Sequence, residues 1–296
     1  MSEDIIICEN LVKIYKTKEL EVLALQGLDL TVGAGELMAI IGNSGSGKST
    51  FLNMIGGLDR PSAGRLIVDG KDLFKLNEKE LVEYKRKTVG FVWQNNARNL
   101  VPYLTAWQNV QLPMIFSSAK KRREKALELL ELVGMSHKKD RYLNQLSGGE
   151  QQRIAIAIAL ANEPKILLAD EPTGSVDVKT ANYILDVFRE LNRSLGLTVV
   201  IVTHDRKLSK KVNRVVAIRD GKTSSEMIVK QSYADKLDLV EMFDEAHDEY
   251  VVMDKAGRVQ IPKEFLESTG ISGNKVRMGM ENGRIVIEPP EESSNI

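Results

Sequence analysis

A glycine-rich loop at residues 42–50 carries the clearest chemistry in the sequence. Its sequence, GNSGSGKST, fits the pattern G-x-x-x-x-G-K-[ST] of loops that bind nucleotide phosphates. Glycines let backbone N–H groups approach phosphate oxygens, because no Cβ intervenes. The pattern predicts that Lys48 reaches the β- and γ-phosphates and that the Ser49 hydroxyl binds Mg²⁺. The other residues expected to line the phosphates are Gly42, Asn43, Ser44, Gly45, Ser46, Gly47 and Thr50.

Two acidic residues and a histidine follow later apolar runs. Asp170 and Glu171 end the run ILLADE, and His204 ends the run VVIVTHD. Asp170 is the expected acidic ligand of the metal. Pro172 ends the strand, so Glu171 can reach the same edge, where we expect it to accept a proton from an attacking water. We expect His204 to arrive at that edge and to contact the γ-phosphate.

A second anion-binding helix start lies at residues 146–153, LSGGEQQR. Ser147, Gly148 and Gly149 precede the apolar helix QQRIAIAIAL, and a helix N-terminus favours an anion. One chain then holds two phosphate-binding ends. The economical explanation is a head-to-tail dimer in which the nucleotide lies between the loop of one copy and this second end of the other.

The elements around these residues alternate in the manner of an α/β protein. The run LMAII precedes the glycine loop, a helix with apolar residues at helical spacing follows it, and KILLAD and LTVVIVTHD are continuous apolar runs typical of buried parallel strands. Strands of this kind deliver side chains to the carboxyl edge of the sheet. The sequence therefore predicts an α/β parallel sheet with a phosphate site at that edge.

Composition excludes several classes of protein. The 296 residues include 41 Lys+Arg and 41 Asp+Glu, so no whole-protein basic footprint for nucleic acid exists. The single cysteine, Cys8, excludes a disulfide framework and a cysteine metal cluster. The first residues are acidic, unlike a secretory signal, and no apolar run approaches the ~18 residues of a membrane span. We expect a cytosolic chain that reaches a membrane only through a partner.

With these motifs in this order, residues 1–235 resemble the ATP-binding-cassette (ABC) family. Tyr15 in KIYKT is similar to the aromatic residue that stacks on adenine, and Gln94 in FVWQ to the glutamine that contacts Mg²⁺ and responds to the membrane partner. LSGGEQ is the family signature, which includes Glu150. Asp177 in TGSVD matches the D-loop, and His204 matches the switch histidine.

The resemblance implies a fold and a setting. The fold would be an ABC nucleotide-binding domain, a P-loop NTPase with a RecA-like core and a helical subdomain. The segments GLDLTVGAGE, LTAWQNVQLP and DEPTG are similar to those of the subgroup that powers macrolide export, lipoprotein release and antimicrobial-peptide resistance. The resemblance implies ATP and Mg²⁺ as cofactors, a homodimer of ATPase subunits, a separate transmembrane permease, and a peripheral place on the cytoplasmic face of a bacterial membrane.

Three departures from the subgroup stand out. Ile158 replaces an arginine, which predicts the loss of a polar contact on that helix. The D-loop reads Val176-Asp177 where Leu-Asp is common. The stretch NNARNLV after Gln94 is about two residues longer than the resemblance implies, in a region expected to face the permease.

The C-terminal part changes character. We predict an acidic helical linker at residues 236–247, a small β-rich domain at 248–289 and a flexible tail at 290–296. The segments MDKAGRVQIPKEFLESTGI and KVRMGMENGRIVIEP resemble the swapped-hairpin (AbrB-like) fold, in which two copies interleave and basic residues read DNA. Acids outnumber bases here, which favours dimerisation over DNA binding. The bases are Lys255, Arg258, Lys263, Lys275, Arg277 and Arg284, and the acids are Asp248, Glu249, Asp254, Glu264, Glu267, Glu281, Glu288, Glu291 and Glu292.

The preferred interpretation is the ATPase subunit of a transporter that exports, or extracts from the membrane, an amphiphilic or peptide-like substrate. Two alternatives stay open. One is an ABC ATPase that moves no substrate, such as a mechanotransmitter acting on a permease-like partner. The other is an ATP-responsive regulator that binds DNA through residues 245–296.

Overall fold

The computed structural model describes most of the chain and divides it into two compact units, residues 1–250 and 251–296. None of the described helices is long and apolar enough to cross a membrane. The described ranges are 3–16, 20–94, 100–116, 118–174, 176–205, 211–229, 247–253, 257–271 and 276–289.

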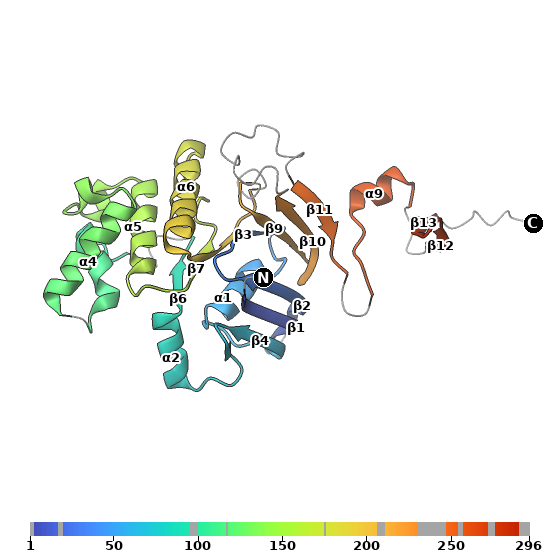
Figure 1. Cartoon of the computed structure of the whole chain (residues 1–296), viewed down its shortest axis with the longest axis horizontal. Coiled ribbons are helices and arrows are strands. Elements are labelled where there is room, and N and C mark those ends of the chain that lie inside the picture. The colour runs from blue at the N-terminus through green and yellow to red at the C-terminus, as the bar shows by residue number, and fades with distance from the viewer. Residues whose placement is uncertain are drawn as a thin grey trace, which may run out of the picture. The chain divides into compact units, whose positions relative to one another are not determined.

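A seven-stranded sheet forms the centre of the first unit (Figure 1), in the order β11-β10-β9-β3-β8-β7-β6. Its middle strands are parallel: β3 pairs with both β8 and β9, and β7 pairs with β6 and β8. β10 runs antiparallel to β9. The parallel set confirms the α/β prediction. The bounds are β3 Leu37–Ile41, β6 Val89–Val92, β7 Ile166–Asp170, β8 Thr198–Val202, β9 Arg214–Arg219, β10 Lys222–Val229 and β11 His247–Val251.

A second, antiparallel sheet has the order β2-β1-β4-β5. Its strands bury one face and leave the other partly exposed, as their alternating burial records. The bounds are β1 Asp4–Lys16, β2 Glu21–Gly33, β4 Ala63–Val68 and β5 Lys71–Asp72.

The helices form two groups. α1 (Lys48–Ile55) leads from the glycine loop and lies with α2 (Glu78–Lys87) near the antiparallel sheet, where Tyr84 of α2 donates a hydrogen bond to Ile55 O. The others build a helical layer, green in Figure 1, with α6 between it and the strands. Their bounds are α3 Ala106–Gln111, α4 Ala119–Leu132, α5 Gly148–Leu160 and α6 Val178–Leu195, joined by short 3-10 turns at Leu112–Met114, Ser136–Lys138 and Leu143–Gln145.

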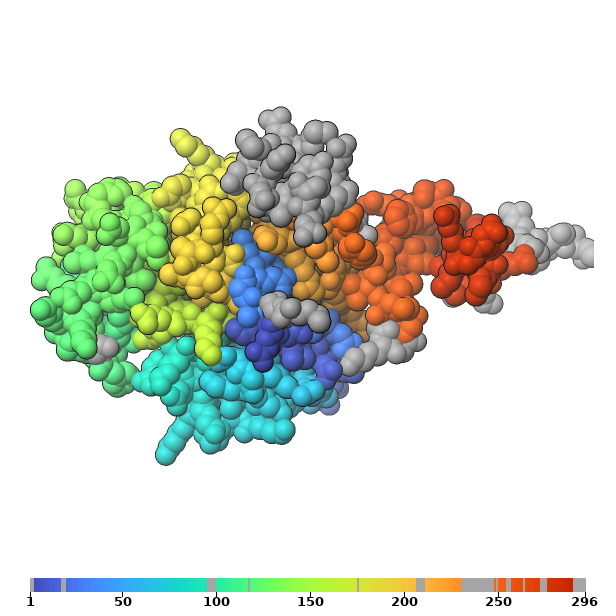
Figure 2. Space-filling view, viewed as in Figure 1, coloured from blue at the N-terminus to red at the C-terminus, as the bar shows by residue number. Residues whose placement is uncertain are grey.

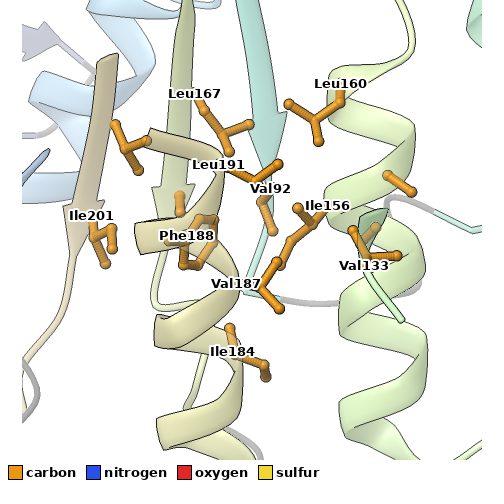
Figure 3. Close-up of a cluster of buried hydrophobic side chains, with 14 of the residues drawn as sticks. Val92, Val133, Ile156, Leu160, Leu167, Ile184, Val187, Phe188, Leu191 and Ile201 are labelled. Atoms are coloured by element: carbon orange, nitrogen blue, oxygen red, sulfur yellow. The ribbon is translucent and has the colours of Figure 1, made fainter. Parts of the chain in front are cut away.

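Two apolar cores lie on opposite faces of the central sheet. Alternation along β3 sends Leu37, Ala39 and Ile41 to the core under α5 and α6, and Met38 and Ile40 to the core under α1. Both faces are covered, which explains why these strands read as continuous apolar runs. Figure 3 shows the first core, where side chains of α6 and α5 meet over β6 and β7. Ile158 of α5, which replaces the subgroup's arginine, packs against this core.

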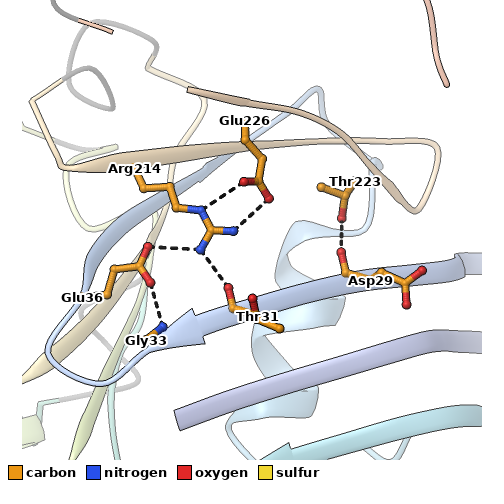
Figure 4. A network of polar contacts seen from close by, with 7 residues as sticks. All are labelled: Asp29, Thr31, Gly33, Glu36, Arg214, Thr223 and Glu226. Carbon is orange, nitrogen blue, oxygen red and sulfur yellow. Dashed lines mark hydrogen bonds and ion pairs between the residues drawn. The ribbon is translucent and has the colours of Figure 1, made fainter. Parts of the chain in front are cut away.

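An arginine joins the two sheets (Figure 4). Arg214 of β9 forms ion pairs with Glu226 of β10 at 2.8 Å and with Glu36 at 3.2 Å, and it donates to Thr31 O at 2.8 Å. Burial by itself would lower the pKa of Arg214, but the two carboxylates raise it above the ordinary value. The guanidinium therefore stays charged and ties β2 to the central sheet.

The second unit contains a short helix, α9 (Lys263–Ser268), and a hairpin of β12 (Arg277–Glu281) and β13 (Arg284–Glu288). Asn282 and Gly283 turn the hairpin with φ of 50° and 76°, as the Asn-Gly pair predicts. One expectation is wrong: His247, assigned to the helical linker, lies in strand β11. The rest of that linker, the tail beyond residue 289 and residues 95–99 of NNARNLV lie outside the described residues.

Candidate active site

The glycine loop joins β3 to α1 and leaves backbone N–H groups available for an anion. Gly47 stands before α1 with φ of 101°, and no side chain caps this helix start. A Cβ at Gly47 would lie 2.6 Å from Ala24 O, and one at Gly42 would lie 2.2 Å from Ile218 O. Both positions therefore need glycine for close backbone packing as well as for a ligand. The uncapped helix start is suited to phosphate.

Lys48 reaches back over the loop. Its side chain is only 8% exposed, and Nζ donates to Gly42 O at 2.9 Å and Asn43 O at 2.8 Å. Burial lowers the pKa of Lys48, while the nearby charges of Glu171 and Asp170 oppose that shift. Ser46 Oγ is buried and has no hydrogen-bond partner within the described part of the chain. A buried cation and an unsatisfied hydroxyl at an uncapped helix start fit a polyphosphate.

The predicted magnesium residues lie together. Ser49 Oγ donates to Asp170 Oδ1 at 3.1 Å, although 121 residues separate them. Within the described ranges, no group of three or more His, Cys, Asp and Glu could hold a metal by itself. An alcohol and one carboxylate fit Mg²⁺, which keeps several waters and takes further ligands from substrate phosphates.

Glu171 and His204 form a contacting pair at the carboxyl ends of β7 and β8. His204 Nδ1 makes a hydrogen bond with Glu171 Oε2, and the histidine is exposed while the glutamate is half-buried. Glu171 has φ of 47°, a left-handed conformation that is strained for this residue, and its N–H donates to Val202 O at 2.9 Å. The imidazole of His204 thus contacts Glu171 in this structure, and its contact with the γ-phosphate stays a prediction.

Gln94 ends near the same point. A Cβ at Gly174 would lie 3.5 Å from Gln94 Nε2 and 3.6 Å from Glu171 Oε2, so both side chains reach Gly174.

Tyr15, on β1, has a ring that is 38% exposed and a hydroxyl that donates to Asp59 at 2.7 Å.

The signature residues lie elsewhere. In Figure 1, α5 belongs to the helical layer and lies apart from α1. Ser147 caps α5 by accepting from Glu150 N at 3.4 Å, and Glu150 accepts from Ser147 N at 2.8 Å. Glu150 also pairs with Lys138 at 2.6 Å. Partial burial would raise the pKa of Glu150, but these donors hold it below its usual value. Its carboxylate serves its own helix start.

The D-loop aspartate and the signature glycine meet through one threonine. Asp177 caps α6 and accepts from Thr180 N at 3.0 Å and Thr180 Oγ1 at 2.7 Å, which lowers the pKa of Asp177. A Cβ at Gly149 would lie 2.1 Å from Thr180 Cγ2. The signature glycine is therefore required by packing inside its own chain.

Comparisons with known proteins show the family of the chain. Residues 25–174 match the family model described as ABC transporter. The chain belongs to the ABC transporter family. It is 48% identical over 214 residues to the ABC transporter ATP-binding protein YvrO of Bacillus subtilis, covering 72% of this chain and 92% of YvrO. It is 44% identical over 228 residues to the macrolide export ATP-binding/permease protein MacB of Rhodopirellula baltica, covering 76% of this chain and 33% of MacB.

A solved structure supports the enzymatic class. The dimeric ATP-binding cassette MJ0796, in a post-hydrolysis state bound to ADP and Pi, is 42% identical, covers 76% of this chain and 99% of its own, and has a TM-score of 0.70. The chain is thus an ATP-binding subunit of an ABC transporter and an ABC-type ATPase.

This ABC ATPase gathers some of the predicted residues and separates others. The loop, Asp170, Glu171, His204 and Gln94 converge, whereas the signature residues at the start of α5 lie apart from the loop. Sequence reasoning missed Asp59, Lys13 and Thr180. The spacing of Asp177 and Thr180 at a helix start is an N-cap signal that could have found the last of these. Asp59 carries no local signal, because its partners are 44 and 46 residues away.

Proposed function

We propose that the chain hydrolyses ATP at the glycine loop with the residues named above. Lys48 and the loop N–H groups would hold the phosphates and stabilise charge on the transferred phosphoryl group. Glu171 would accept a proton from the water that attacks the γ-phosphorus, and His204 would hold the glutamate in place and contact the γ-phosphate. Ser49, Asp170 and Gln94 would hold Mg²⁺, which when bound neutralises charge on the phosphate oxygens. Tyr15 would stack on adenine.

We further propose that the working unit is a head-to-tail dimer. The observation that supports this most is that the glycine loop at the start of α1, which has no side-chain cap, and the signature residues Ser147–Gly149 at the start of α5 lie apart in one chain. Ser147, Gly148 and Gly149 of the second copy would bind the γ-phosphate, with Glu150 keeping that helix start in shape. The D-loop Asp177 would lie at the same interface. MJ0796 is dimeric, which favours a dimer here as well.

The test is Glu171→Gln. We expect ATP binding to persist, turnover to fall by about 10²- to 10⁴-fold, and a stable dimer to form with ATP in size-exclusion chromatography. Glu78→Gln is a matched control, because Glu78 is exposed and pairs with the exposed Arg60 at 2.9 Å. Turnover near the wild-type rate in Glu171→Gln would show that the assignment of the base is wrong.

A separate permease is the proposed partner. A groove of about 410 Å³ separates α2 from the helical layer, and Figure 2 shows the green surface of that layer beside the cyan surface around α2. Phe116, on its wall, is 82% exposed, and Ile115 beside it is 63% exposed. Exposed apolar side chains around a groove are typical of protein interfaces. Docking there would place the ATPase on the cytoplasmic face of the membrane.

The proposed transport is export, or extraction from the membrane, of an amphiphilic or peptide-like substrate. Its support is the likeness to MacB, whose name joins macrolide export with ATP-binding and permease functions. Capture of the tagged chain from native membranes in mild detergent should recover a multi-span permease. Phe116→Asp should reduce that recovery, whereas Leu195→Asp, at an exposed site on α6, should not. Recovery of the same permease with Phe116→Asp would contradict the docking site.

The predicted swapped-hairpin domain, residues 248–289, is proposed to pair with its twin, although its first residues, 248–251, lie in strand β11 of the central sheet. A two-stranded hairpin is marginally stable alone, and this one exposes Met278, Met280 and Ile285 by 66–80%. Pairing with a second copy would bury them. Deleting residues 252–296, which leaves strand β11 in place, should lower the dimer population of the isolated subunit and leave ATP binding by the monomer intact. An unchanged dimer population, with salt-dependent DNA binding by the full chain, would favour the regulator instead.

A further inference from the structure

Tyr15 is held by a cluster of charged groups that the ATPase chemistry does not use. The Tyr15 hydroxyl donates to Asp59 Oδ2 at 2.7 Å. Asp59 Oδ1 accepts from Lys13 Nζ at 2.6 Å, and Lys13 Nζ also donates to Arg60 O at 2.8 Å. Asp59 comes just after α1, and its own N–H donates to Asn53 O in that helix. The phosphate-loop helix and the ring on β1 are therefore joined through Asp59, by its backbone N–H on one side and its carboxylate on the other.

The lysine sits against one face of the ring. Lys13 is only 9% exposed, and Nζ lies 4.7 Å from the centroid of the Tyr15 ring. Lys13 and Tyr15 are two residues apart on β1, so their side chains project from the same side of the strand. The ring is 38% exposed, which leaves surface for a second aromatic partner. The negative ring face attracts the cation, which leaves the opposite face for a base.

The ring also lies beside the phosphate loop. Tyr15 pairs with Val22 across β1 and β2, and Ala24 of β2 contacts Gly47 so closely that a Cβ there would lie 2.6 Å from Ala24 O. Burial and the hydrogen bond to Asp59 raise the pKa of Tyr15, and the side chain of Thr50, the last residue of the loop, opposes that shift. An adenine attached to phosphates in the loop has this ring within reach.

The carboxylate in the cluster stays charged at neutral pH. Partial burial would raise the pKa of Asp59, but hydrogen bonds from Lys13, Tyr15 and the Arg60 N–H hold it below its usual value. A buried lysine without a counter-charge would be unfavourable. Asp59 therefore performs two tasks, because it neutralises Lys13 and fixes the hydroxyl of Tyr15.

We propose that Asp59 is a positioning residue for the base of the nucleotide: it fixes the plane of the Tyr15 ring for stacking and keeps the Lys13 cation against the opposite face. The inference rests on the proposed role of Tyr15 and goes beyond it, because Asp59 acts only through Tyr15 and Lys13. Its effect belongs to the base and not to the phosphates.

The test compares ligands with and without a base. ADP and inorganic pyrophosphate are titrated by calorimetry into the full-length wild type, Asp59→Ala, Asp59→Asn, Tyr15→Ala and Tyr15→Phe. Asp59→Ala should weaken ADP about 3- to 10-fold, a fraction of a full aromatic–base contact, and change pyrophosphate less than about 2-fold. It should raise KM for ATP and leave kcat at saturating ATP close to wild type. Asp59→Asn keeps an acceptor for the Tyr15 hydroxyl, so its affinity for ADP should lie between those of the wild type and Asp59→Ala.

Controls separate the positioning role of Asp59 from the stacking role of Tyr15. Glu9→Ala removes an exposed acid that pairs with Arg65 at 3.2 Å on the same sheet, and it should change neither ligand. If Tyr15→Ala weakens ADP but Asp59→Ala does not, the positioning role of Asp59 is wrong and the stacking role stands. If Tyr15→Ala leaves ADP unchanged, the stacking role itself fails. Equal weakening of ADP and pyrophosphate by Asp59→Ala would mean a general disturbance of the loop and would overturn the inference. When Asp59→Ala is combined with Tyr15→Phe, it should weaken ADP binding less than it does in the wild type.

Discussion

Replacing Gly149 by alanine tests whether glycine is required at this position by packing within the chain or by nucleotide binding. In Gly149→Ala the new Cβ would lie 2.1 Å from Thr180 Cγ2, whereas carbon atoms in contact prefer about 3.5–4.0 Å. Thr180 is not free to rotate away, because its Oγ1 donates to Asp177 Oδ2 at 2.7 Å. The start of α5 must therefore move away from the start of α6.

The magnitude follows from two opposing effects. Overpacking of this kind costs about 1–3 kcal/mol, and alanine is favoured over glycine within a helix by up to about 1 kcal/mol. The expected net loss for Gly149→Ala is about 1–2 kcal/mol of unfolding free energy. Thr180→Ser removes the clashing methyl group. The next atoms of Thr180 would lie 3.5 and 3.7 Å away, which is ordinary contact.

The assay is urea unfolding of the full chain without nucleotide, followed by circular dichroism, so that no ligand contributes. Gly149→Ala with Thr180→Ser should be at least as stable as Thr180→Ser alone, a coupling of about 1–3 kcal/mol. Thr180→Val keeps a methyl group and should not rescue Gly149→Ala. Additive effects of Gly149→Ala and Thr180→Ser, or equal rescue by Ser and Val, would refute the packing argument.

Three further predictions concern stability. Arg214→Met should lower the unfolding free energy by about 3 kcal/mol, because it leaves Glu36 and Glu226 without their cation. Loss of an exposed ion pair would cost at most about 1 kcal/mol. The midpoints of urea unfolding distinguish the two values. Tyr84→Phe should cost about 1–2 kcal/mol in the same assay and leave KM for ATP unchanged, because its hydroxyl donates to Ile55 O inside the core. The folded state lowers the pKa of Asp59, so the stabilisation that Asp59 provides is present above about pH 4 and is lost as the pH falls through the lower folded pKa. Asp59→Asn should therefore be less stable than wild type at pH 7 and approach it in acid, and a constant difference at all pH values would contradict this.

Several features could be predicted from the sequence because they depend on neighbouring residues. The glycine loop needs an uncapped helix start directly after a strand, and residues 37–50 contain both signals. The capping box of Ser147 and Glu150 and the hairpin turn at Asn282-Gly283 are likewise local. The continuous apolar runs of β3, β7 and β8 predicted strands buried on both faces.

Other features required the tertiary structure because they join residues distant in the sequence. The sheet order places β3 between β8 and β9, which lie more than 150 residues further along the chain. That order brings Arg214 to Glu36, and Asp170 to Ser49. It also brings His204 onto Glu171, where the sequence predicted a contact with phosphate only.

The chemistry of the site was thus determined by local sequence, and its positioning by the fold. The residues that bind phosphate, metal and a proton lie within a few positions of one another in each motif. Their pattern is therefore visible in short segments. The groups that hold them, such as Asp59 beneath Tyr15 and Thr180 against Gly149, come from segments that only strand pairing and helix packing bring together. No short segment contains that information, because which strand lies beside which is decided by the burial of two complete apolar cores.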